Sequence, residues 1–301
     1  MEDRIITYGG QAVIEGVLMR GQKALAIAMR NPDGEIVVHE EKLANVYRSR
    51  ITKIPFLRGI IMLWDALGLG MRALTISANT QTGEDEKLEG WALYLTIAVS
   101  MTIGVGLFFL LPAALGGWVE KLMTPDVSAG GGAHVWLGNL LEGVVRLLLL
   151  IGYIWAIGFM PDIKRLFAYH GAEHKTINAY EAGAELTPES VAKFPLEHPR
   201  CGTAFMLTLV LVSILVFTAL GPLPILWRLL SRVLLIPVLA GIAVEYIRWT
   251  ANHLDSKFVQ WIIKPNLAMQ SLTTREPDLS MLEVAIQSFQ TMRMAEEEVV
   301  T

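Results

Sequence analysis

A short stretch of this sequence combines two histidines and a glutamate at a spacing that suits metal-dependent chemistry. It reads YHGAEH over residues 169–174. Two histidines four residues apart lie on one face of a helix and can bind a single metal ion. The order H-x-x-E-H is the inverzincin pattern, in which a glutamate activates a metal-bound water. The pattern predicts His170 and His174 as ligands of a divalent metal ion, with zinc as the candidate, and Glu173 as the catalytic general base.

A catalytic zinc site needs a third protein ligand, and the sequence offers several polar side chains close to its apolar segments. These are Glu197, His198 and Cys201 in EHPRCG, Glu245 near the end of an apolar segment, and His253 and Asp255 just after it. We expect His198, Cys201 or Glu245 to complete the metal site.

Each of these residues also has a purely structural interpretation. His170 and His174 continue an apolar helical stripe, so they could be buried neutral histidines that hold backbone carbonyls. Cys201 could be a small core residue. Glu245 could pair with Arg248 instead of a metal ion.

The two histidines need a helix, and the flanking residues supply its limits. Pro161 and Asp162 predict a helix start after an apolar segment, and Gly183 predicts its end. Gly171 lies between the histidines and lowers the intrinsic stability of this helix. It therefore argues against a rigid site.

The composition indicates a membrane protein. Of 301 residues, 53% are hydrophobic and only 18% are charged, whereas soluble domains carry about a quarter charged residues. The mean hydropathy is +0.45. A net charge of −4 gives no reason to expect a nucleic-acid partner. The single cysteine excludes an internal disulfide framework and fits a reducing compartment.

Four segments are long and apolar enough to cross a bilayer, whose core takes about 20 residues of helix. They cover residues 91–115, 140–160, 204–220 and 233–249. Pro222 and Pro224 break the chain before the fourth segment. We expect residues 225–232 to form a short interfacial helix, with Arg228 and Arg232 at the level of the lipid headgroups.

Lysine and arginine are distributed unevenly between the flanks of these segments. They are frequent before residue 91, in the loop 161–203 and after residue 249, whereas the loop 116–139 holds only Lys121. Such residues favour the cytoplasmic side. We therefore expect both termini and the loop 161–203 on the cytoplasmic face of the inner membrane, which brings the candidate ligands to the same face.

These patterns predict a mainly α-helical membrane protein with about four transmembrane helices, a small N-terminal β-hairpin unit and cytoplasmic amphipathic helices. We divide the chain into a cytoplasmic β-containing unit (1–54), an amphipathic surface helix and linker (55–90), a transmembrane domain (91–249) with the cytoplasmic loop 161–203, and a cytoplasmic helical tail (250–301).

The first of these units carries the strongest β signals. Turn residues at 31–34 (NPDG) separate two strand-like runs, so we expect a β-hairpin over residues 23–42. The glycine-rich stretch 9–21 lacks the spacing of a phosphate loop and predicts close-packed β structure, with Glu15 as an inward-facing polar group.

Two amphipathic helices flank the apolar segments. The helix predicted over residues 55–78 is too charged to span, and we expect it to lie on the membrane surface or to pack on the β unit. A polar linker covers 81–89. The helix that begins near Pro277 must bury an apolar face, either on the β unit or on a neighbouring subunit.

Four long motifs carry a resemblance to a known family. They are GGQAVIEGVLMRG near the start, YHGAEHKTINAYE and HPRCGTAF in the middle, and LTTREPD towards the end. Through them nearly the whole chain resembles the bacterial YqhQ-like family (domain of unknown function family 1385), uncharacterised membrane proteins sometimes catalogued as predicted metal-dependent enzymes. The resemblance implies several transmembrane helices and a cytoplasmic cluster of motifs, with no established reaction.

Two functions fit the sequence. The first is a metal-dependent hydrolase at the cytoplasmic membrane face that acts on a peptide or lipid-like substrate. The second is a non-catalytic membrane protein, such as an oligomeric channel, a transporter or an assembly scaffold, whose histidines are structural or regulatory. The apolar segments carry almost no ionisable residues at mid-membrane depth, which argues against a transporter. A homo-oligomeric pore lined by uncharged residues escapes that objection.

Overall fold

The computed structural model describes residues 8–43, 54–82, 90–123, 132–221 and 223–298. The strands are β1 (Gly9–Val13), β2 (Gly16–Arg20), β3 (Ala24–Arg30) and β4 (Ile36–Lys42). The helices are α1 (Leu57–Gln81), α2 (Gly90–Val105), the π-helix η4 (Gly106–Leu110), α3 (Leu111–Met123), α4 (Gly132–Ile157), α5 (Pro161–Glu181), α6 (Pro188–Val191), α7 (Gly202–Ala219), α8 (Ile225–Leu234), α9 (Ile236–Ala251), α10 (Lys257–Ile262), α11 (Lys264–Thr273) and α12 (Leu279–Glu298). Most of the predicted linker 81–89 lies outside the described residues.

The four strands form one antiparallel sheet in the order β1-β2-β3-β4. The predicted hairpin is confirmed, with Ala24 opposite Lys42 and Arg30 opposite Ile36. The glycine-rich stretch forms β1 and β2, which confirms its β structure. Gly16 is needed there, because a Cβ at this position would lie 2.3 Å from the carbonyl oxygen of Ala28.

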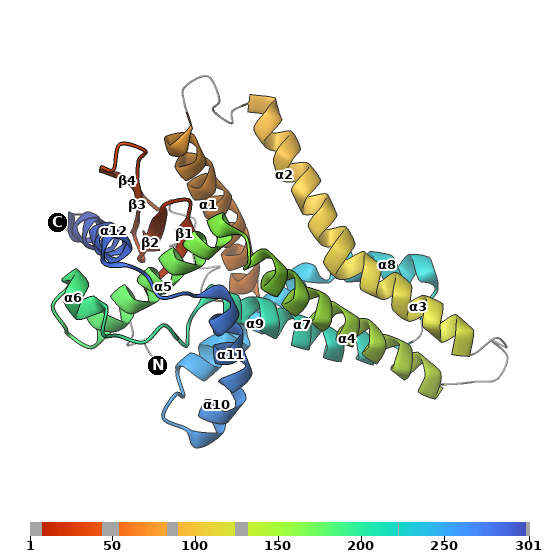
Figure 1. Ribbon diagram of the computed structural model, residues 1–301. Coiled ribbons are helices and arrows are strands. Elements are labelled where there is room, and N and C mark those ends of the chain that lie inside the picture. Colours follow the sequence, from red (N-terminus) through yellow and green to blue (C-terminus); the bar gives the residue numbers. More distant parts are fainter. Residues whose placement is uncertain (1–7, 44–53, 83–89, 124–131, 222, 299–301) are drawn as a thin grey trace.

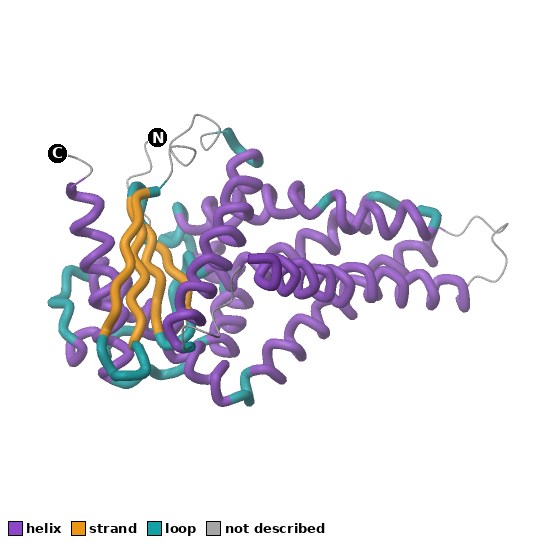
Figure 2. The backbone as a smooth tube through the Cα atoms, turned by 90° about the horizontal axis from the view of Figure 1, so that it is seen from above, coloured by secondary structure: helices purple, strands orange, loops and turns teal. Residues whose placement is uncertain are grey.

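Helices cover both faces of this sheet (Figure 1; Figure 2, strands between the helices). Alternate residues of β2 and β3 point to opposite faces, as the pleat requires. One face, with Val17 and Ala26, packs on α5 and α12. The other, with Leu18 and Ile27, packs on the C-terminal half of α1 through Ala73. Of the two alternatives for the C-terminal helix, the structure therefore shows packing on the β unit.

Beyond the sheet, α2, α3, α4 and α7 extend away from it, with the short helix α8 beside α3 (Figure 1). Among the described residues, four helices are long and apolar enough to cross a membrane: Leu57–Gln81, Gly90–Leu122, Leu137–Ile157 and Gly202–Ala219. The pair α8 and α9, bent by 47°, passes the same test as one broken span. Three predicted spans are therefore confirmed, and the fourth is only part of this bent pair.

The structure corrects our expectation for α1. We had expected its charged residues to exclude a membrane crossing. Its length and hydropathy nevertheless pass the test for a span. Its C-terminal half nevertheless packs on the β unit, as one of our two alternatives stated.

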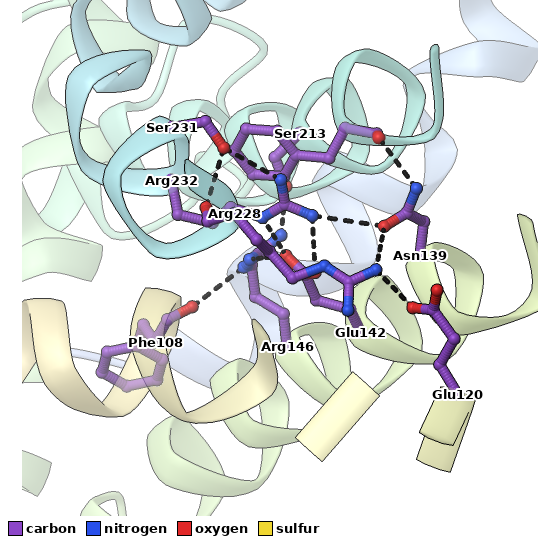
Figure 3. A network of polar contacts seen from close by, with 10 residues as sticks. Phe108, Glu120, Asn139, Glu142, Arg146, Ser213, Arg228, Ser231 and Arg232 are labelled. Carbon is purple, nitrogen blue, oxygen red and sulfur yellow. Dashed lines mark hydrogen bonds and ion pairs between the residues drawn. The ribbon is translucent and has the colours of Figure 1, made fainter. Parts of the chain in front are cut away.

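A cluster of charged side chains lies inside the helical part (Figure 3). Glu142 accepts hydrogen bonds from Arg146 at 2.8 Å and, with both carboxylate oxygens, from Arg232 at 2.7–2.8 Å. Arg228 pairs with Glu120 at 2.6 Å. Arg146 also donates to the carbonyl of Phe108 in η4. The cluster therefore joins α3, α4, η4 and α8 through charge-assisted hydrogen bonds.

This cluster contradicts two expectations. Arg228 and Arg232 are 4% and 1% exposed, so they point into the protein instead of toward headgroups. The reason is that Glu142 offers a buried carboxylate to Arg232 and the half-buried Glu120 offers one to Arg228. In addition, Arg146 is the tenth of the 21 residues in Leu137–Ile157, so an ionisable residue does lie at the middle of a candidate span. The absence of such residues therefore no longer argues against a transporter.

We predict that Glu142→Gln destabilises the protein strongly, because it leaves Arg146 and Arg232 buried without their carboxylate. Breaking a buried ion pair from one side costs about 3–5 kcal/mol of unfolding free energy. Chemical unfolding in mixed micelles measures this. The matched control is Glu283→Gln, whose carboxylate pairs with Arg30 on the surface and should change the unfolding free energy by about 1 kcal/mol or less. Equal effects of the two substitutions would contradict the prediction.

Candidate metal centre

Helix α5 carries the H-x-x-E-H motif, and three residues separate it from the end of α4. Pro161 occupies its first turn, and Gly183 follows its last residue with a φ of 70°. The predicted limits of this helix are therefore confirmed. The sheet and α12 cover one side of α5, and the motif residues Gly171, Ala172, Glu173 and His174 are all buried.

The two histidines of the motif lie beside Cys201. Their ring centroids are 4.4 Å apart, and His170 Nε2 lies 3.2 Å from the sulfur of Cys201. One ligand atom from each of the three residues lies within 4.8 Å of the other two. Imidazole nitrogen and thiolate sulfur are the ligands that zinc prefers. Among the described residues, this is the group of three that could hold a metal ion.

Backbone carbonyls orient both imidazole rings. His170 Nδ1 donates to the carbonyl of Thr273 at 2.8 Å, and His174 Nδ1 donates to the carbonyl of Leu196. This hydrogen bond through Nδ1 leaves Nε2 as the nitrogen of each ring that can bind a metal ion, and it is typical of metal-ligating histidines. His174 Nε2 is buried and has no hydrogen-bond partner among the described residues. The arrangement fits a metal ion.

Glu173 lies next to this group and against the sheet. A Cβ at Gly10 of β1 would lie 2.9 Å from its carboxyl carbon, so Gly10 leaves the space that the side chain fills. Burial raises the pKa of Glu173 to about 7, opposed by the charge of His170 and by a hydrogen bond from the Gly10 N–H. Its Oε2 is buried and has no hydrogen-bond partner among the described residues.

A cavity of about 210 Å³ opens beside these residues, and we call it the polar cavity. Its lining includes Glu173, Cys201, His198, Arg20 and Arg200. A small molecule in it would contact both the candidate base and a candidate ligand. Clefts that hold a few convergent polar groups with perturbed pKa values are typical binding or active sites.

Side chains of α5 hold the loop that delivers Cys201. Lys175 donates to the carbonyls of Ala192 and Phe194 at 2.8 Å, and Asn178 donates to those of Pro195 and Glu197. From α11, the amide of Gln270 exchanges two hydrogen bonds with the backbone of His198. The loop is therefore fixed without regular secondary structure, because its backbone groups find side-chain partners.

Sequence reasoning missed Lys175, Asn178 and Gln270. A signal was available for two of them, since Lys175 and Asn178 come one and four residues after His174 on α5. A lysine that is 4% exposed must be paired, and here Glu276 also contacts it at 2.7 Å.

Gly171 has the opposite effect from the one we expected. A Cβ at this position would lie 2.2 Å from the carbonyl oxygen of Arg275. Its absence lets residues 273–275 approach α5, where the Arg275 N–H donates to the carbonyl of Phe167 at 2.9 Å and Thr273 meets His170. Gly171 therefore supports the site through close packing.

Of the three residues predicted to complete the metal site, Cys201 lies with His170 and His174, whereas His198 and Glu245 are not part of this group. The ring of His198 lies 5.7 Å from that of His174, but its Nε2 accepts from Arg200 at 3.3 Å. Burial lowers the pKa of His198, and the 3.8 Å to Glu181 is too long for a hydrogen bond. Glu245 instead pairs with Arg58 of α1.

The remaining predicted polar residues also lie in described parts of the chain. His253 is exposed and contacts the carbonyl of Trp249 at 2.7 Å. Glu15 binds Arg165 and Tyr169 of α5 from the turn between β1 and β2, so it does face the protein as expected. Asp255 is exposed.

Comparison with known proteins places the chain in a family. The family described as "Protein of unknown function (DUF1385)" matches residues 54–295. The chain is also 35% identical over 297 residues to a Bacillus subtilis (strain 168) protein named "Uncharacterized protein YqhQ", covering 94% of this chain and 91% of that one. The chain therefore belongs to the DUF1385 family, which confirms the resemblance seen in its motifs. No solved structure matches it.

We predict that Glu173→Gln stabilises the metal-free protein at pH 8 more than at pH 5. The folded carboxyl has a pKa of about 7 against an ordinary 4.5, so the folded state keeps a proton that the unfolded state loses. Wild-type stability therefore falls as the pH rises from about 4.5 to above 7. The glutamine variant lacks this loss, and its melting temperature relative to wild type should rise by several degrees between the two pH values.

The control for this measurement is Glu185→Gln at an exposed position in the loop after α5. Its melting temperature relative to wild type should be the same at pH 5 and pH 8. A pH-independent effect of Glu173→Gln would show that burial does not hold the proton on Glu173.

Proposed function

We propose that this DUF1385 member is a metal-dependent hydrolase at the cytoplasmic membrane face, with zinc held by His170, His174 and Cys201. The observation that supports the site most directly is that both imidazoles are fixed by carbonyls through Nδ1 while a thiol lies beside them. Three protein ligands with one open position are the pattern of catalytic zinc, whereas structural zinc sites are closed by four.

A divalent ion bound here would supply Lewis acidity and would lower the pKa of a coordinated water. Glu173 would accept the proton of the attacking water and return it to the leaving group. In the metal-free protein burial raises the pKa of this carboxyl to about 7. A divalent cation beside it would lower that pKa and favour the carboxylate, which is the form that a general base needs. Arg20 and Arg200 line the same cavity and would orient a negatively charged substrate group.

The cytoplasmic location is supported by the lysine and arginine counts of the flanks. The candidate spans support a location close to a bilayer. Helices α4 and α7 pass the span test, α5 follows α4, and α7 begins at Gly202, directly after Cys201.

We predict that purified wild-type protein holds about one zinc ion per chain and that the double variant His170→Ala/His174→Ala holds almost none. Elemental analysis of protein purified in parallel measures this. The matched control is His253→Ala, which removes an exposed histidine outside the site and should keep the wild-type metal content. Equal metal in wild type and double variant would end the metal hypothesis.

We predict that Glu173→Gln keeps the zinc but lowers kcat by about 10²–10⁴, the usual contribution of a general base. The probes are p-nitrophenyl butyrate, p-nitrophenyl palmitate and p-nitrophenyl phosphate, measured with zinc-loaded protein in lipid nanodiscs. A zinc-loaded variant with the wild-type rate would refute Glu173 as the base. Wild-type protein that binds zinc but turns over none of the three probes would instead favour a structural or regulatory cluster in a non-catalytic membrane protein.

A further inference from the structure

A second cavity, of about 200 Å³, lies between helices α1, α7 and α9, and we call it the apolar cavity. Leu63, Phe205, Val244 and Ile247 contribute to its lining, which is almost entirely apolar. Of its three helices, α1 and α7 are long and apolar enough to span, and α9 belongs to the bent pair. An apolar cavity between such helices is open to the kind of molecule that partitions into a bilayer.

The apolar cavity adjoins the polar cavity that Glu173 lines. The two share Met62, Arg200, Cys201 and Gly202 in their linings. Gly202 is exposed, and a Cβ at this position would meet no atom of the described chain within 4 Å, so the space directly beside this shared wall is empty. Cys201, a candidate metal ligand, therefore stands at the point where an apolar compartment meets a polar one.

The two cavities differ in their charged lining residues. Arg20, Arg200 and Glu173 line the polar cavity, whereas Arg200 and Arg248 line the apolar one. Glu181 pairs with Arg200, so part of this positive charge is already balanced. The Nε of Arg200 is nevertheless buried and has no hydrogen-bond partner among the described residues. This donor favours a negatively charged group in the polar cavity, since arginine binds phosphate and carboxylate through charge-assisted hydrogen bonds.

We infer that the substrate of the proposed hydrolase is an anionic amphiphile, a molecule whose negatively charged head lies in the polar cavity beside Glu173 while its single apolar chain lies between α1, α7 and α9. This inference rests on the proposed function for its catalytic meaning, but the binding geometry stands on the two cavities alone. It favours a lipid-like substrate over a peptide, because the apolar cavity offers almost no polar group to a peptide backbone.

The test uses full-length protein in phosphatidylcholine nanodiscs and two photoreactive probes with the same diazirine-bearing chain. One is a hexadecyl phosphate and the other is the uncharged hexadecanol. Labelling of the α9 peptide that contains Val244 and Ile247 is measured by mass spectrometry, together with the zinc content of each sample. We expect the phosphate to label this peptide about tenfold more than the alcohol, as a charge-assisted hydrogen bond would give.

Gly202→Leu should fill the space beside the shared wall without a clash, and it should reduce labelling by the phosphate about tenfold at unchanged zinc content. Its matched control is Gly152→Leu on α4, an exposed helical glycine that also has open space around it. This control should label as wild type does. If Gly202→Leu loses zinc through its neighbour Cys201, Ile247→Trp, which fills the apolar cavity from α9, replaces it.

Removal of charge gives an independent readout. Arg20→Gln should lower labelling by the phosphate and leave labelling by the alcohol unchanged. Equal labelling by both probes in wild type, or full phosphate labelling in the zinc-bound plugged variants, would overturn the inference while leaving the metal site intact. Absence of zinc from wild type would refute the proposed hydrolase instead, so the two failures are distinguishable.

Discussion

The burial of α5 is the constraint on which the rest of the site depends. The sheet and α12 cover one side of the helix, so most of the polar groups that it buries need a partner inside the protein. His170, His174, Lys175 and Asn178 find theirs on backbone carbonyls of two separate segments. These bonds fix the segments as firmly as they fix the side chains, and Cys201 is brought to the histidines as a result.

A second set of buried charges serves the helical half in a comparable way. Glu142 and Arg146 lie on α4 and tie it to η4 and α8. Because α4 ends at Ile157 and α5 begins at Pro161, this fixed helix also fixes the base of the site helix. Buried ion pairs of this kind contribute little net stability but penalise any arrangement that separates the partners. They favour one packing of the apolar helices, whose dispersion contacts alone distinguish alternatives poorly.

Much of the fold follows from local signals in the sequence. The hairpin of β3 and β4 follows from turn residues at 31–34, and the limits of α5 follow from Pro161 and Gly183. The partners of Arg228 and Arg232 could not be found in this way, because Glu120 and Glu142 lie 108 and 90 residues away in the chain. An arginine next to an apolar segment is expected to contact lipid headgroups unless a carboxylate inside the protein binds it. Only the packing of the helices brings such carboxylates to Arg228 and Arg232.

For the site, the sequence alone determined that His170 and His174 share one helical face, because a spacing of four residues does so in any α-helix. The tertiary structure decided which further side chain lies beside them. Cys201 does so because α5 and α11 hold its loop, whereas Glu245 is taken by Arg58. The tertiary structure also showed a different role for Gly171. Glycine weakens an isolated helix, but here the missing side chain lets the backbone of Arg275 pack against α5. Helical spacing is a local property, but the approach of separate segments depends on buried carbonyl partners and on the space left by a missing side chain.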